Sequence, residues 1–140
     1  MSVKYEAMVV TCIDPRCQKF IPIFLKEKNL EDKYSLFSIA GGTLTVTGDS
    51  YNNWKQTFLD NLKITITNHK IHKIIVINHR DCLMAKEMFG DECVSNEECE
   101  TNSHHRINQL FQNQISKIYP DIKFEYYLLS MDGKFLNMKT

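Results

Sequence analysis

The chain has 140 residues, of which 43% are hydrophobic and 24% are charged, as is typical of one globular domain with a substantial core. Its 17 basic and 17 acidic residues give a formal net charge of zero, which argues against a general nucleic-acid binder, and it has no run of 18 apolar residues that could cross a membrane. Residues 1–6 lack the pattern of a signal peptide, so we expect residues 1–140 to form a single cytoplasmic domain. Five cysteines in a reducing cytosol then favour metal ligands or free thiols over a disulfide framework.

Apolar runs alternate with helical patterns along the chain. This order predicts an α/β fold with a mainly parallel sheet of four to five strands flanked by helices. The expected strands are residues 6–12, 34–39, 73–78, 124–130 and 135–137. The continuous Ile and Val run at residues 74–77 predicts a strand that is buried on both faces.

Helical spacing is found at residues 20–25, where Pro22 starts or kinks the helix, and at residues 51–69, 82–89 and 105–119. In the last of these helices, the expected buried stripe consists of Ile107, Leu110, Phe111, Ile115 and Ile118. Residues 43–49 are rich in threonine, and we expect them to be irregular. We expect the polar residues 90–102 to form a loop.

Two groups of metal-ligating side chains follow two of these strands. Cys12, Asp14 and Arg16 come after the first strand, and His79 and Cys82 come after the third. If the two strands are neighbours, these side chains meet at the carboxyl edge of the sheet, where reactive residues of parallel sheets gather. Two thiolates and one imidazole suit zinc, and three protein ligands with one open position are typical of a catalytic zinc site.

Asp14 and Arg16 would then act beside the ion. Asp14 can accept a hydrogen bond from the zinc-bound water, and Arg16 can hold Asp14 by a bidentate pair that keeps it off the metal. Taken one at a time, Cys12 and Cys82 are more simply explained as small core residues, and His79 as a hydrogen-bonded loop histidine. Their joint occurrence at two strand ends, with polar partners, favours the metal site.

These motifs resemble those of the β-class carbonic anhydrase family, which carries Cys-x-Asp-x-Arg after its first strand and His-x-x-Cys after its third. Here the matching residues are Cys12, Asp14, Arg16, His79 and Cys82. The resemblance continues through residues 58–62 and 74–77 and into residues 126–136, so it covers most of the chain as a short version of the fold.

The resemblance implies an enzyme with one zinc ion per chain, in which a zinc-bound hydroxide hydrates carbon dioxide reversibly to bicarbonate. Cys12, His79 and Cys82 would hold the zinc, and Asp14 and Arg16 would match the dyad that orients the hydroxide. In some members of the family this dyad opens and the aspartate takes the fourth zinc position. The resemblance also implies a homodimer or a dimer of dimers.

The chain departs from the family at three places. Residues 38–42 read Ser-Ile-Ala-Gly-Gly where the family usually has Arg-Asn-Ala-Gly-Asn, so Ile39 replaces a polar residue. Asn78 precedes the histidine and Leu83 follows the second cysteine, where the family often has glycine. Leu83 could therefore narrow the pocket or select another substrate. The alternatives are a hydrolase of a related small molecule such as a carbon–sulfur compound, a non-catalytic zinc protein, or a metal-free thiol protein.

Other candidate sites are weaker. Cys93, Cys99, His104 and His105 could form a second metal site, but their spacing fits no zinc pattern, and we prefer a solvated loop. Cys17 could be a redox-sensitive thiol near the site, and we prefer a small buried residue. The Ala-Gly-Gly sequence at residues 40–42 lacks a full phosphate-binding pattern and predicts a turn.

Overall fold

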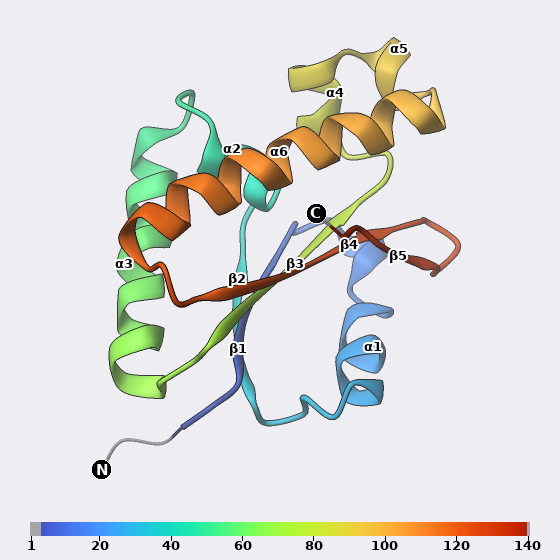
Figure 1. Cartoon of the computed structure of the whole chain (residues 1–140). Coiled ribbons are helices and arrows are strands. Elements are labelled where there is room, and N and C mark those ends of the chain that lie inside the picture. The colour runs from blue at the N-terminus through green and yellow to red at the C-terminus, as the bar shows by residue number, and fades with distance from the viewer. Residues whose placement is uncertain (1–3, 140) are drawn as a thin grey trace.

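A five-stranded sheet forms the centre of the molecule in this computed structural model, which describes residues 4–139 (Figure 1). The strand order is β2-β1-β3-β4-β5, and the strands are β1 Ala7–Thr11, β2 Tyr34–Ser38, β3 Lys73–His79, β4 Lys123–Leu129 and β5 Phe135–Asn137. β1 to β4 are mutually parallel, and β5 runs antiparallel to β4. The α/β class and the mainly parallel sheet are thereby confirmed. The expected absence of a signal peptide rests partly on residues 1–3, which lie outside the described range.

Helices cover both faces of the sheet. They are α1 Ile21–Glu27, α2 Thr43–Thr47, α3 Asn52–His69, α4 Leu83–Phe89, α5 Asp91–Val94 and α6 Glu97–Ile118, with a 3₁₀ turn, η1, at Pro15–Cys17. Figure 1 shows α3 and α6 together on one face and α1 on the other. Pro22 lies in the first turn of α1, where its missing N–H costs no hydrogen bond. No helix within residues 4–139 has the length and apolar character that a membrane crossing needs.

Alternate residues of the central strands pack into two separate cores. Met8 and Val10 point to the side of α3 and α6, where Phe58 and Phe111 are buried. The other side of the sheet packs against Ile21 and Leu25 of α1, and its side chains are Ala7, Val9, Ile75 and Ile77. The burial of β3 on both faces is confirmed, and the sheet gives a rigid platform for the segments that leave its carboxyl edge.

The segment expected to be irregular at residues 43–49 contains a short helix instead. All five residues of α2 are buried, and Thr45 Oγ1 donates to the carbonyl oxygen of Ala40 at 2.6 Å. The threonines that argued against a helix have low helix propensity, but tertiary burial overrides that weak preference. The expectation for this segment was therefore wrong.

The expectation of a polar loop at residues 90–102 is also wrong, because α5 lies within this segment. The last long helix, α6, begins at Glu97 and not at residue 105 as expected. The Asn96 side chain accepts a hydrogen bond from the Cys99 N–H at 2.9 Å and caps the helix, and acidic residues in the first turn favour its dipole. Of the expected buried stripe, Leu110 and Ile118 are 52% and 53% exposed, while the other three residues are buried.

Candidate metal centre

The three predicted metal ligands lie together at the carboxyl edge of the sheet. β1 pairs with β3 in parallel, with Thr11 opposite Ile77, so Cys12 leaves one strand beside the end of the other. One ligand atom each from Cys12, His79 and Cys82 lies within 4.8 Å of the others, and all three residues are buried. This is the only such group of three or more among residues 4–139.

The orientation of His79 suits a metal ligand. Its Nδ1 lies 2.7 Å from the carbonyl oxygen of Arg80, which can only accept, so Nδ1 carries the proton and Nε2 carries the free lone pair. Nε2 is buried without a hydrogen-bond partner among the described residues. A buried acceptor left without a partner costs about 1–3 kcal/mol, and a metal ion would remove this cost. The donor set of two sulfurs and one nitrogen fits zinc.

The two cysteine sulfurs shift each other's pKa in opposite directions. The neighbouring Cys82 is the main cause that lowers the pKa of Cys12, and Cys12, together with burial, raises the pKa of Cys82. The backbone N–H of Gly41 also donates to Cys12 Sγ at 3.3 Å, and this further favours the thiolate. Because zinc binds thiolates, its binding would release the proton of the Cys82 thiol.

Asp14 is held beside the three ligands by Arg16. Asp14 Oδ1 accepts from the backbone N–H and Nε of Arg16 at 2.8 and 3.1 Å, and Oδ2 accepts from Nη2 at 2.8 Å. These hydrogen bonds from Arg16 are the main reason why the pKa of Asp14 falls to about 2. Asp14 Oδ2 also lies 3.8 Å from Nε2 of His79. The carboxylate is therefore ionised, close to the ligand group, and bonded to Arg16 through both oxygens.

The residues that depart from the family pattern have defined places. Gly42 has a φ of +55°, and a Cβ there would lie 2.7 Å from Oδ1 of the buried Asn78, so glycine allows this turn to approach β3 closely. Asn78 Nδ2 donates to Thr43 Oγ1 at 2.8 Å.

The other two departures lie away from the ligand group. Ile39 packs against the core on the side of α3 and α6. Leu83 is 70% exposed, so it is not packed into the ligand group. The turn expected at residues 40–42 is confirmed.

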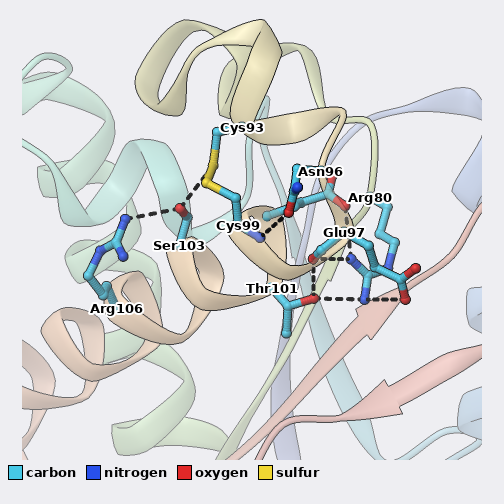
Figure 2. Close-up of a disulfide and its surroundings, with 9 residues drawn as sticks. Arg80, Cys93, Asn96, Glu97, Cys99, Thr101, Ser103 and Arg106 are labelled. Atoms are coloured by element: carbon cyan, nitrogen blue, oxygen red, sulfur yellow. Dashed lines mark hydrogen bonds and ion pairs between the residues drawn. A yellow bond between two sulfur atoms is a disulfide. The ribbon is translucent and has the colours of Figure 1, made fainter.

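The second group of cysteines and histidines is not a metal site. Cys93 and Cys99 form a disulfide that joins α5 to the first turn of α6, as Figure 2 shows. The expectation that all five cysteines are free thiols or metal ligands is thus wrong for this pair. His104 is fully buried and packs edge-on against Phe89, so it does not lie in a solvated loop. Cys17 is buried, as expected.

A buried carboxylate that the sequence analysis missed contacts the segment between His79 and Cys82. Glu100 of α6 is 3% exposed, and its oxygens accept from Arg80 Nη1 at 2.9 Å and from the Asp81 N–H at 2.8 Å. Figure 2 shows Arg80 reaching the first turns of α6, where it also bonds Thr101. Nothing in the polar sequence of residues 90–102 distinguishes this glutamate from its exposed neighbours.

A parallel sheet with two cysteines and a histidine at its carboxyl edge places this chain among proteins with the β-carbonic anhydrase fold. A carbonic anhydrase from Streptococcus mutans superposes with a TM-score of 0.62 at 16% identity, over 99% of this chain and 86% of that one. One of two tetrameric β-carbonic anhydrases of Sordaria macrospora superposes with a TM-score of 0.62 at 7% identity, over 99% and 82% of the two chains. At these identities the likeness establishes the fold alone.

The family is established by the sequence. Residues 2–130 match the family model described as "Putative carbonic anhydrase", and the chain belongs to this family. A protein of Rickettsia bellii is 29% identical over 128 residues, which cover 91% of this chain and 78% of that protein. A protein of Rickettsia conorii is 29% identical over 91% of this chain and 69% of its own length. Both relatives are named as uncharacterized proteins.

Proposed function

We propose that this chain is a carbonic anhydrase that hydrates carbon dioxide reversibly to bicarbonate, with one zinc ion held by Cys12, His79 and Cys82. The observation that carries the proposal is the buried ligand group, in which Nε2 of His79 has no hydrogen-bond partner among the described residues. Family membership and the fold support the same activity. When bound, zinc supplies a Lewis acid that makes a water ligand far more acidic than bulk water.

Asp14 has the properties of the residue that orients the attacking water. As an ionised carboxylate it can only accept hydrogen bonds, so it fixes the direction of a water O–H and leaves the oxygen lone pair free to attack carbon dioxide. Arg16 binds both Asp14 oxygens and fixes the rotation of the carboxylate. Arg16 therefore restrains Asp14, and Asp14 acts on the substrate water.

The same hydrogen bonds favour an enzyme over a non-catalytic zinc protein. In the non-catalytic alternative, Asp14 would be the fourth zinc ligand and no position would remain for water. Here both oxygens of Asp14 are bonded to Arg16, which disfavours the rotation that such ligation needs. Leu83 is exposed and does not close the site. It therefore gives no support to the alternative in which a narrowed pocket selects another substrate.

The test is stopped-flow hydration of carbon dioxide on protein of known zinc content, with variants that separate metal binding from turnover. Cys82→Ser removes a zinc ligand, so we expect it to lose both zinc and activity. Asp14→Asn keeps the three ligands, so we expect it to retain zinc while kcat/KM falls about 100-fold. Full turnover by Asp14→Asn would refute the role of Asp14, and a fully zinc-loaded parent protein without turnover would refute the proposed activity.

We extend the proposal to a homodimer or a dimer of dimers. The Sordaria macrospora proteins of the same fold are tetrameric. In this chain, β2 is an edge strand, and its Leu36 is 57% exposed. An edge strand with an exposed apolar side chain is a surface on which another chain can pair. The cytoplasmic location expected from the sequence stays a prediction.

A further inference from the structure

Arg16 binds a second carboxylate besides that of Asp14. Its Nη1 donates to Asp81 Oδ2 at 2.9 Å, and its Nη2 donates to the Asp81 backbone carbonyl oxygen at 3.0 Å. Arg16 therefore lies between Asp14, which follows β1, and Asp81, which lies between His79 and Cys82. A planar guanidinium that is bonded along two edges has a fixed orientation as well as a fixed position.

Asp81 can offer both of these acceptors because of its backbone conformation. Its φ is +55°, in the left-handed region that few residues other than glycine adopt, although aspartate and asparagine do so more readily than most. Such a conformation persists where neighbouring groups hold it in place. Here the Asp81 N–H donates to Glu100 Oε2 at 2.8 Å.

Glu100 contacts the segment between His79 and Cys82 and can hold it in place. It is 3% exposed, and its second oxygen accepts from Arg80 Nη1 at 2.9 Å, so its buried charge is paired. The carbonyl oxygen of Arg80 in turn accepts a hydrogen bond from Nδ1–H of His79. One carboxylate from α6 thus contacts both residues that separate His79 from Cys82.

We propose that Asp81 is a positioning residue that holds Arg16 against Asp14, and that Glu100 anchors Asp81 in the conformation this requires. The functional part of this inference rests on the proposed role of Asp14 in hydration. Arg16 is 49% exposed, so without Asp81 one edge of its guanidinium would face solvent and the side chain could turn away from Asp14. The rotation of the Asp14 carboxylate would then no longer be fixed.

The state of Arg16 can be measured without reference to activity. The chain has three arginines, Arg16, Arg80 and Arg106, so nitrogen NMR of protein labelled at arginine resolves each guanidinium, and Arg→Lys variants assign them. A guanidinium bonded along two edges rotates slowly about its Nε–Cζ bond and gives separate Nη signals. In Asp81→Asn, which retains a residue that tolerates positive φ, we expect the Nη signals of Arg16 to merge while those of Arg80 stay separate.

Two further variants make the test specific. Asp81→Gly removes the side chain but keeps the backbone donor and acceptor, and we expect the same merging of the Arg16 signals. Glu100→Gln removes the charge that binds Arg80 and Asp81, so we expect the signals of both Arg16 and Arg80 to change. Asp49→Asn, at an exposed aspartate that pairs with Lys55, is the matched control and should leave Arg16 unchanged. Unchanged Arg16 signals in both Asp81 variants would overturn the proposal.

The functional part is tested on the zinc-loaded proteins. We expect Asp81→Asn to keep the zinc content of the parent and its KM while kcat falls about 10-fold, as is usual for residues that orient a metal site from outside. A normal kcat alongside a mobile Arg16 would refute the positioning role in hydration. A zinc-loaded parent that hydrates no carbon dioxide would refute the proposed function, and the NMR comparison would still decide whether Asp81 holds Arg16.

Discussion

Of the two ring nitrogens of His79, one has a hydrogen-bond partner and the other has none among the described residues, so the second is available to a metal. The carbonyl oxygen of Arg80 accepts a hydrogen bond from Nδ1–H, which leaves Nε2 as the free acceptor in the ligand group with the two cysteines. The motif in the sequence indicates a histidine ligand, but it does not say which nitrogen binds. That choice follows from a backbone carbonyl whose position depends on the conformation of the segment after β3.

His104 provides a prediction at the residue scale. It is fully buried and neither ring nitrogen has a hydrogen-bond partner among the described residues. Burial is the main cause that lowers the pKa of His104 from 6.5 to about 4, and the positive charge of Arg80 adds to this effect. The pKa of His104 is lower in the folded protein than in the unfolded chain. Neutral His104 therefore makes its full contribution to the free energy of unfolding above pH 6.5. That contribution is lost as the pH falls from about 6.5 to about 4.

We therefore expect His104→Phe to lessen the acid sensitivity of the free energy of unfolding. Urea unfolding at pH 7 and at pH 4 should show that the loss of stability between these values is smaller by about 3 kcal/mol in the variant. The same substitution at the half-exposed His72 is the control. An equal acid loss in His104→Phe and in the parent would contradict the prediction.

At the scale of elements, helix α6 contacts the candidate metal centre although none of the three predicted ligands lies on it. Its first turns supply Glu100 to the segment between His79 and Cys82, and Asn96 caps its start. The sequence predicts that this helix starts at residue 105, because residues 97–104 carry no apolar stripe. This end of the helix is held by a cap, a disulfide and ion pairs. Such contacts produce no periodic pattern of apolar residues, which is the pattern that predicts a helix from sequence.

The Cys93–Cys99 disulfide provides a prediction at this scale. It closes a loop of six residues between α5 and α6, and a loop this short corresponds to the lower end of disulfide stabilisation, about 2 kcal/mol. We expect the double variant Cys93→Ser and Cys99→Ser to lose about this much free energy of unfolding. The expected loss should also appear when the parent protein is treated with a dithiol reductant.

The reductant also gives the control for this prediction. It should leave the stability of the double variant unchanged, because no disulfide remains to be reduced. A parent protein that is equally stable with and without reductant would show that this pair contributes nothing to stability. Zinc content should be followed in parallel, because a reductant that removed metal from the proposed ligands Cys12 and Cys82 would change the stability for a second reason.

At the scale of the whole molecule, the exposed edge of β2 leads to a prediction about assembly. We expect light scattering after size exclusion to give the mass of two or four chains. Leu36→Lys places a charge on the exposed edge strand, so it should shift this mass toward one chain without unfolding the domain. A single-chain mass for the parent protein would contradict the expected homodimer, and an unchanged mass for Leu36→Lys would exclude this edge as the interface.

The sequence by itself determined the fold class, the strand ranges to within about a residue, and the residue types of the candidate metal group. It could do so because burial on both faces of a parallel sheet leaves continuous apolar runs, and because reactive side chains follow such runs directly. The tertiary structure alone decided that Cys93 pairs with Cys99, that residues 43–47 are helical, and that Glu100 bonds Asp81, which in turn bonds Arg16. These features depend on contacts between segments that are distant in the chain or on burial of polar residues, and neither leaves a periodic pattern in the sequence.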